Sequence, residues 1–258
     1  MSPTGQPESD VIAPDPIGAM AVWTYSLPPG ERFDLHVHHD FHQLAWAEHG
    51  AMWVQTAGGL WVLPPTRALF IPAGVAHVTG THGRSLMRSV FLRPHACPVV
   101  WDAPSVLAVR PLLRELIRYL AAPELAGAPR ERAEAVLFDL LEPVDAVPLM
   151  VPMPRDARAR EVAEALLADP SDRRTLDDWG RTTGASGRTL ARLFASETGM
   201  TFGRWRTQAR LRAALAHLAE GVPVTVVAHR VGYVTPSAFV AAFHRAFGLP
   251  PGAYFAGT

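Results

Sequence analysis

The sequence predicts a two-domain α+β protein, with an antiparallel β-barrel followed by an all-α domain that contains two helix-turn-helix units. Three observations support this prediction. Residues 19–98 contain many short apolar or alternating runs separated by Gly, Pro and Asp, which is typical of antiparallel strands. Residues 156–258 show helical periodicity and repeat one pattern twice. Between the helical stretches, the proline-rich residues 143–155 indicate a linker.

Length and composition are those of a folded protein with a hydrophobic core in each domain, since 48% of the 258 residues are hydrophobic. Residues 1–18 are polar and proline-rich and lack the features of a signal peptide, so we expect a disordered leader. No apolar run reaches the roughly 18 to 20 residues that span a bilayer. Cys97 is the single cysteine and has no partner for an internal disulfide. These features predict a soluble cytoplasmic protein.

Residues 99–142 should contain two helices, because apolar residues recur at spacings of three and four within 105–121 and 130–141. Two uses of their apolar faces are open. The helices could cover the barrel that precedes them, or they could form the seam of a homodimer. We expect packing on the barrel together with dimerisation.

An internal repeat organises the C-terminal domain. Its positions recur at an offset of 48 or 49 residues, with one residue inserted in the second copy: Gly180, Gly184, Leu190, Phe194, Gly199 and Trp205 match Ala228, Gly232, Phe239, Phe243, Gly248 and Tyr254. Each copy has the pattern of a helix, a tight turn at a glycine and a second helix. The sequence therefore predicts two helix-turn-helix units joined by a helix over residues 201–221.

The outer faces of the second helices carry side chains suited to a DNA major groove. Residues 154–258 hold 14 arginines against 9 acidic residues. The connecting helix of about 19 residues would span about 28 Å, close to the roughly 34 Å between adjacent major grooves. The predicted DNA contacts are Ser186, Arg188, Thr189, Arg192, Thr235 and Ser237, with His244 and Arg245 on phosphates. The alternative is a helical interaction domain whose arginines form a solvated face.

Residues 155–258 resemble the DNA-binding domain of AraC-type transcription regulators, including the run from Gly232 through AFVAAFHRAFGLPPGAYF. The resemblance implies sequence-specific binding to double-stranded DNA by a homodimer. If the protein is an activator, the resemblance also implies contact with RNA polymerase.

The stretch HVHHDFHQL places four histidines in residues 36–44. On a strand, His36 and His38 would point to one face, with Phe33, Leu35 and Val37 on the other. Together with the later run IPAGVAH, this stretch resembles the two motifs of the cupin fold. The resemblance implies that His36, His38 and His77 meet inside the barrel.

Two kinds of ligand are possible for these three histidines. They could hold a divalent transition metal such as zinc, nickel or iron, or they could bind a small organic molecule without metal. Further candidates for the ligand-binding wall are His42, Gln43, Trp46, Trp53 and Phe70.

The function that these features favour is transcriptional regulation by a small molecule or metal ion bound in the barrel. The alternative is a cupin metalloenzyme, a dioxygenase or isomerase. Gln43 or His42 stands where the first cupin motif usually has a glutamate ligand, and an enzyme does not need a second domain shaped for DNA. We therefore expect no enzymatic activity.

Overall fold

The computed structural model describes residues 19–81, 83–144, 149 and 151–255, and the leader predicted for residues 1–18 lies outside this range. The chain forms two compact units, described separately below. The first comprises residues up to 57 together with 62–145, and the second comprises residues 146–256 together with Gly58–Trp61. The predicted order of an antiparallel β domain and a helical domain is confirmed. The finer boundaries at residues 98, 142 and 155 stay predictions.

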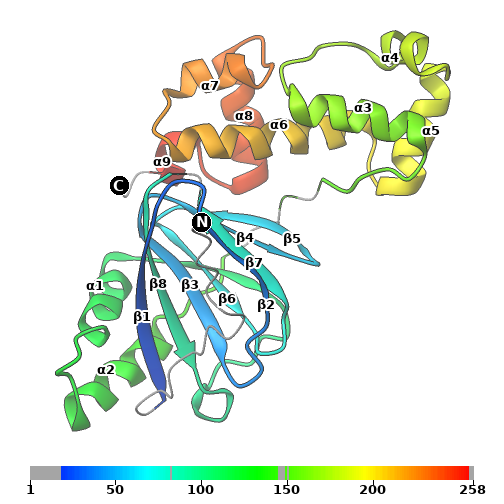
Figure 1. The fold of residues 1–258 in the computed structure, drawn as a ribbon. Coiled ribbons are helices and arrows are strands. Elements are labelled where there is room, and N and C mark those ends of the chain that lie inside the picture. Colours follow the sequence, from blue (N-terminus) through cyan, green and yellow to red (C-terminus); the bar gives the residue numbers. More distant parts are fainter. Residues whose placement is uncertain (1–18, 82, 145–148, 150, 256–258) are drawn as a thin grey trace, which may run out of the picture. The chain divides into compact units, whose positions relative to one another are not determined.

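The described residues from Met20 to Ala108 form nine strands in two sheets (Figure 1). The five-stranded sheet has the order β1-β8-β3-β6-β9, and its strands are β1 (Met20–Leu27), β3 (His42–His49), β6 (Arg67–Ile71), β8 (Ser85–Leu92) and β9 (Ser105–Ala108). The four-stranded sheet has the order β2-β7-β4-β5, and its strands are β2 (Arg32–His36), β4 (Met52–Thr56), β5 (Gly59–Leu63) and β7 (His77–Thr81). A short 3-10 helix, Pro94–Ala96, follows β8.

The strand register gives the five-stranded sheet two different faces. Leu44 pairs with Phe70 on β6 and with Val90 on β8, and all three side chains are fully buried in one hydrophobic cluster. Their neighbour Gln43 pairs with Ile71 and Phe91 instead, so these three residues point to the opposite face. One face of the sheet therefore carries the hydrophobic cluster, and the other faces the inside of the domain.

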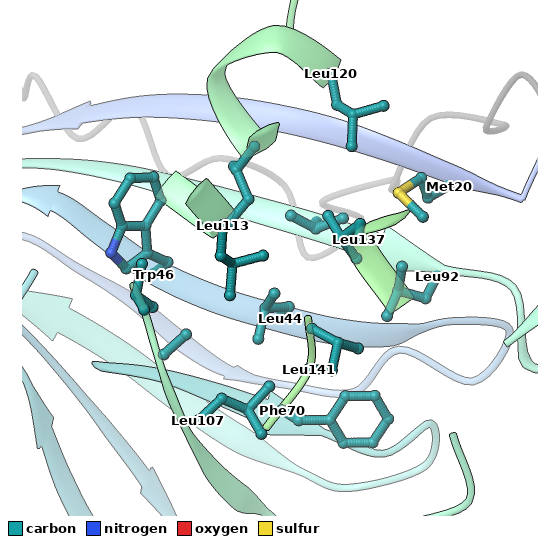
Figure 2. Packing of buried hydrophobic residues seen from close by; sticks show 14 of the residues in the cluster. Met20, Leu44, Trp46, Phe70, Leu92, Leu107, Leu113, Leu120, Leu137 and Leu141 are labelled. Carbon is teal, nitrogen blue, oxygen red and sulfur yellow. The ribbon is translucent and has the colours of Figure 1, made fainter. Parts of the chain in front are cut away.

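Two helices pack on the first of these faces, α1 (Pro111–Leu120) and α2 (Gly127–Asp139). Figure 2 shows their leucines over the sheet, with Leu113 and Leu120 from α1 and Leu137 from α2 close to Met20 and Leu44. Burial of apolar side chains of this size typically stabilises a fold by about 1.5 to 3 kcal/mol each. Packing on their own domain is thus one use of the apolar helix faces.

The first part of the helix predicted over residues 105–121 is wrong, because residues 105–108 form the edge strand β9 beside β6. Pro111 occupies the first turn of α1, where the missing amide hydrogen is not needed. The preceding Arg110 is extended (φ −80°, ψ 162°), as a residue before proline prefers. The helix therefore cannot begin earlier, and Val106 and Leu107 are buried as strand residues instead.

From Ala157 to Phe255 the described elements are all helices: α3 (Ala157–Ala168), α4 (Leu176–Thr183), α5 (Gly187–Thr198), α6 (Phe202–Ala219), α7 (Val224–Arg230), α8 (Pro236–Phe247) and α9 (Pro251–Phe255) (Figure 1). Trp205 of α6 is fully buried, and its ring nitrogen donates a 2.8 Å hydrogen bond to the Pro152 carbonyl. Within the described part of the chain, none of the helices combines the length and apolar composition needed to cross a membrane.

The internal repeat is visible in the backbone. The amide of Ala185 donates to the Gly180 carbonyl at 3.2 Å, and in the second copy the amide of Tyr233 donates to the Ala228 carbonyl at 2.9 Å. The matching helix-end glycines both have a positive φ, with 70° at Gly199 and 74° at Gly248. The paired core residues Leu190 and Phe239, and likewise Phe194 and Phe243, are all fully buried. The extra residue of the second copy lies in its turn.

Candidate functional site

The first helix-turn-helix unit consists of α4 and α5 and is fixed by local hydrogen bonds. Thr175 caps α4 in a capping box with Asp178, and α4 ends at Gly184 in the left-handed conformation (φ 68°). Ser186 then caps α5 by accepting a 3.1 Å hydrogen bond from the Thr189 amide. These caps set the start of α5 and with it the directions of the side chains on its outer face.

The close approach of the two helices depends on glycine. A Cβ atom on Gly180 would lie 2.3 Å from the Ala185 carbonyl oxygen, and one on Gly187 would lie 2.1 Å from the Asp177 carboxylate. The smallness of Gly180 therefore admits the turn itself, which brings α5 against α4.

The outer face of α5 carries Arg188 and Arg192, which are both exposed and one helical turn apart. Within the described residues, neither makes an ion pair. The two predicted hydroxyl contacts behave differently, because the Ser186 and Thr189 hydroxyls lie 2.9 Å apart and bond each other. Two free guanidinium groups therefore stand on this face beside a pair of hydroxyls that belong to the helix cap.

The second unit, α7 and α8, repeats this arrangement with other side chains. Thr235 caps α8 by accepting from the Ala238 amide at 3.2 Å, and its hydroxyl lies 3.2 Å from that of Ser237. A shallow open groove along α8 is lined by Pro236, Ser237, Val240, Ala241, His244 and Arg245. Three predicted contacts, Ser237, His244 and Arg245, thus line one groove, with small side chains near the start of α8 and His244 and Arg245 near its end.

Three imidazoles meet in the N-terminal unit. The ring of His77, at the start of β7, is fully buried, and its centroid lies 4.3 Å from that of His36 at the end of β2. The His38 ring lies 5.0 Å from His36 and 5.5 Å from His77. One nitrogen atom of each ring can be chosen so that all three lie within 4.8 Å of one another. The structure thus brings together the three histidines that the sequence singled out.

A β-bulge in β2 shapes this cluster. Phe33 pairs with Thr79 on β7, whereas His36 pairs with His77, so β2 uses one more residue than β7 between the two pairs. The extra residue reverses the alternation, and both Phe33 and His36 line the same pocket. The prediction that Phe33 points away from the histidines is therefore wrong, while Leu35 is 71% exposed as the alternation requires.

Backbone carbonyls orient two of the rings. Nδ1 of His36 lies 2.6 Å from the Asp34 carbonyl oxygen, and Nδ1 of His77 lies 2.9 Å from that of Val75. Because a carbonyl oxygen only accepts, Nδ1 carries the hydrogen in each neutral ring. In this tautomer Nε2 of each ring carries a lone pair. A nitrogen of this kind can bind a metal ion or accept a hydrogen bond from a ligand.

Burial keeps two of the rings neutral. Desolvation lowers the pKa of His77 to about 4, with the neighbouring His36 and His38 adding repulsion. Desolvation, and then the charge of His36, also lowers the pKa of His38 to about 4. Near pH 7 both rings are therefore uncharged.

Gln43 closes the cluster from β3. Its side-chain amide lies 2.9 Å from Nε2 of His77 and 2.8 Å from the Ser89 hydroxyl. The structure places the amide oxygen against Nε2 of His77 and the amide nitrogen against the Ser89 hydroxyl. A neutral His77 with its hydrogen on Nδ1 has a lone pair at Nε2, so its hydrogen bond with Gln43 requires the amide turned by 180°, with the amide nitrogen donating to His77 and the Ser89 hydroxyl donating to the amide oxygen. Gln43 therefore occupies the acceptor site of His77 that a metal ion would use.

The pocket beside these histidines is small. Its walls are Tyr25, Phe33, His36, His38, Gln43, Thr79, Met87, Ser89 and Phe91, and the space left inside is about 10 Å³. That is room for about one water molecule. The Thr79 hydroxyl is buried and has no hydrogen-bond partner among the described residues. Three imidazoles with two available lone pairs suit a divalent transition metal, and the orphan hydroxyl also marks a place for one polar ligand atom.

The other predicted wall residues lie elsewhere. Trp46 and Phe70 belong to the cluster beneath α1 and α2. His42 shares their face of β3, accepts a 3.0 Å hydrogen bond from the Ala73 amide and contacts the Phe70 ring. Trp53 packs over Gly80, where a Cβ atom would lie 2.4 Å from its ring. None of these four lines the pocket of His36, because strand alternation turns them to the opposite faces of their sheets.

One charged cluster was not foreseen from the sequence. The carboxylate of Glu48, at the end of β3, is 6% exposed and receives hydrogen bonds from Arg88 on β8 and from Arg118 on α1, the latter at 2.5 Å. Burial alone would raise the pKa of Glu48, but the two arginines outweigh it and lower the pKa. The sequence signal for it was an acidic residue directly after the apolar run of residues 44–47.

Comparison with known proteins gives consistent relatives. A family model described as a helix-turn-helix domain matches residues 179–257. The HTH-type transcriptional regulator NimR of Escherichia coli K12 is 34% identical over 217 residues, which cover 83% of this chain and 79% of NimR. A putative AraC-like transcription regulator of Streptomyces lividans is 34% identical over 173 residues, covering 62% of this chain and 52% of that protein.

Among solved structures, the DNA-binding domain of the transcription factor AdpA in complex with a target DNA aligns with a TM-score of 0.37 and 29% identity, covering 38% of this chain and 90% of that domain. The NimR match extends over most of both chains. This chain belongs to the AraC-type helix-turn-helix transcriptional regulators, which are DNA-binding proteins and not enzymes.

Proposed function

We propose that this DNA-binding regulator recognises a specific operator and that a metal ion or small molecule in the histidine pocket controls its binding. The observation that carries the second part is the cluster of His36, His38 and His77, whose ring nitrogens converge within 4.8 Å, with burial keeping the His38 and His77 rings neutral. A ligand in this pocket regulates DNA binding only if its affinity differs between two arrangements of the protein.

On DNA, Arg188 and Arg192 are the base-reading side chains of the first unit, because both guanidinium groups are exposed on one face of α5. Thr235 and Ser237 contribute from the second unit, and Ser186 and Thr189 complete the surface at the start of α5. His244 and Arg245, near the end of α8, bind phosphates. Loss of a base contact should reduce discrimination between sequences, whereas loss of a phosphate contact should weaken all DNA binding.

The size of the pocket favours a metal ion or a ligand that inserts few atoms. The space of about 10 Å³ excludes a larger effector unless the walls move. His36, His38 and His77 would hold a zinc, nickel or iron ion, which in this protein would act as a bound effector. A small polar molecule is the alternative, with the Thr79 hydroxyl as one of its partners.

We further propose a homodimer formed through α1 and α2. Leu112 and Tyr119 on α1 are 61% and 50% exposed, and Val136 on α2 is 42% exposed. Leu112 and Tyr119 are seven residues apart and therefore lie on one face of α1, where they form an exposed apolar stripe. Dimerisation would remove this stripe from water.

The first experiment is elemental analysis of the purified, untagged, full-length protein beside a His36→Ala/His38→Ala variant, combined with DNA binding. The DNA is an operator selected from random sequences by the wild-type protein. A metal that is retained near one per chain, is lost in the variant and changes operator affinity in the wild type alone supports metal control.

If neither protein binds added zinc, nickel or iron, the metal alternative is wrong and thermal-shift screening of small molecules follows, with the same variant as control. If the wild type fails to select any preferred sequence, the operator-specific part of the proposal is wrong. The His36→Ala/His38→Ala variant should still bind DNA without ligand, because these histidines lie outside the DNA-binding unit.

A further inference from the structure

Arg210 lies in α6, the helix that connects the two helix-turn-helix units, and its guanidinium group bonds the loop between α3 and α4. Its Nε atom donates to the Pro170 carbonyl at 3.0 Å, and its Nη2 atom donates to the Asp172 carbonyl at 3.1 Å. This loop leads directly into α4 of the first unit. One side of Arg210 therefore faces the first unit.

Its other side faces the turn of the second unit. The guanidinium carbon of Arg210 lies 5.6 Å from the ring centroid of Tyr233. A Cβ atom on Gly232 would lie 2.7 Å from Nη2 of Arg210 and 2.9 Å from the Pro170 carbonyl oxygen. The backbone of the second turn thus packs against the same loop, and Arg210 fills the space between them.

The loop between α3 and α4 is also held against the first unit by contacts of its own. Arg174 forms a 2.6 Å ion pair with Asp172 and stacks on the buried ring of Trp179 in α4, with its guanidinium carbon 3.4 Å from the ring centroid. Arg206, one turn before Arg210 on α6, donates to the Arg174 carbonyl at 3.2 Å. A shift of the loop would therefore move α4 with it.

We propose that Arg210 is a positioning residue, which fixes the second helix-turn-helix unit relative to the first and so sets the spacing of α5 and α8 on DNA. The hydrogen-bond partners of this half-buried charge are carbonyl oxygens, and the repulsion from Arg206 and Arg173 opposes the attraction of the Asp172 carboxylate. Burial of a cation in this way adds little net stability. What the arrangement does provide is a three-way contact among α6, the loop and the second turn.

The first test measures the distance between the two second helices in the full-length protein. Spin labels are placed at Ala195→Cys on α5 and Ala241→Cys on α8, which are both exposed, in a Cys97→Ser background that removes the single native cysteine. Labelled protein is diluted with unlabelled protein so that only distances within one chain are measured. Arg210→Met removes both donors and keeps the apolar stem against Tyr233. The matched control is Arg212→Ala, an exposed arginine on the same helix.

We expect one narrow distance distribution for the wild type and for Arg212→Ala, and a distribution at least twice as wide for Arg210→Met. A distribution for Arg210→Met that equals the wild type would overturn the proposal. If Arg210→Met does not fold, Arg210→Lys is used instead, because a single ammonium group does not have the planar fork that spans both carbonyls. The same widening is then expected, and a distribution equal to the wild type would again overturn the proposal.

The second test uses the selected operator and a version with one base pair inserted between the two segments that the units contact. The inserted pair should lower wild-type affinity at least tenfold, because the second segment moves and rotates along the helix. For Arg210→Met the loss should shrink to about threefold or less. A residue that only stabilises the fold would change affinity for both DNAs equally, so an unchanged ratio would contradict the positioning role.

Discussion

Nε2 of His77 lies 2.9 Å from the side-chain amide of Gln43, and this hydrogen bond occupies the atom through which His77 would bind a metal ion. Gln43 is only 3% exposed, and its amide is held from the other side by Ser89 at 2.8 Å. Gln43 therefore competes with any metal at this site.

Replacing the amide by a carboxylate should reverse this competition. In Gln43→Glu, the side chain becomes an oxygen ligand beside three imidazoles, which is a common donor set for zinc and iron. We expect zinc affinity at least tenfold above that of the wild type, measured by competition with a chromogenic chelator. Gln43→Ala, which only frees Nε2 of His77, should fall between the two. Equal affinities for Gln43→Glu and the wild type would show that His77 is not a ligand.

The pH dependence of stability should report the neutral histidines. In the unfolded chain, a histidine binds a proton as the pH falls through about 6.5, whereas burial lowers the pKa of His38 and His77 to about 4 in the folded state. Between these values the unfolded state binds more protons, so stability is fully present above pH 6.5 and is lost as the pH falls to 4. The limiting slope is about 1.4 kcal/mol per pH unit for each proton.

Urea unfolding at several pH values, followed by tryptophan fluorescence, measures this slope. A His38→Asn/His77→Asn variant should show a weaker dependence between pH 6.5 and 4. His39→Asn is the matched control, since His39 is an exposed neighbour of His38. The expectation fails if the double variant keeps the wild-type slope.

The buried carboxylate of Glu48 should be important for docking α1 on the sheet. Glu48→Gln leaves Arg88 and Arg118 without their shared counter-ion, and breaking a buried ion pair of this kind costs about 3 to 5 kcal/mol, less where one partner is partly exposed. Because Arg118 is 35% exposed, we expect a loss of about 2 to 3 kcal/mol in the free energy of unfolding. Glu115→Gln removes a 63% exposed partner of the same arginine and should cost less than about 0.5 kcal/mol. Similar losses in both variants would contradict the role of burial.

The sequence predicts well those features that depend on residues adjacent in the chain. The turn at Gly184 and the cap at Ser186 depend on a few adjacent residues, and so does the spacing that brings His36 and His38 together. The function class followed from the tandem repeat of these local patterns. None of these inferences needed knowledge of distant contacts.

Features that depend on pairing between strands were not predictable. The bulge that turns Phe33 toward the histidines exists only relative to β7. Trp46 and Phe70 were expected in the pocket but lie beneath the helices. Strand alternation shows which residues share a face of a sheet, but it does not show which face the helices cover. Glu48 lies 40 and 70 residues from its two arginines, so no local pattern connects them.

Gly180 and Gly203 offer a matched pair of glycine substitutions. A methyl group on Gly180 would lie 2.3 Å from the Ala185 carbonyl oxygen, whereas one on Gly203, exposed on α6, would have no neighbour within 4 Å. Gly180→Ala should therefore destabilise the first unit by about 2 kcal/mol or more, as strained overpacking does. Gly203→Ala should stabilise the protein by about 0.5 to 1 kcal/mol, because alanine is the better helix former. Chemical unfolding of both variants measures these changes. If both substitutions changed the free energy of unfolding in the same direction, the result would contradict the contact at Gly180.

Arginines on α5 and α8 should differ in what they contribute to DNA binding. Arg192→Ala removes a proposed base contact, so affinity for the selected operator should fall by a factor of about 10 to 100, with a much smaller loss on scrambled DNA. Arg245→Ala removes a proposed phosphate contact and should weaken both DNAs equally, with a salt dependence reduced by about one counter-ion.

Arg132→Ala is the charge-matched control, since Arg132 is an exposed arginine on α2 in the N-terminal unit. Fluorescence anisotropy at three salt concentrations separates these effects, because only a base contact changes the ratio of operator to scrambled affinity. If Arg192→Ala leaves that ratio unchanged, α5 does not read bases through Arg192, and its guanidinium must bind the DNA backbone instead.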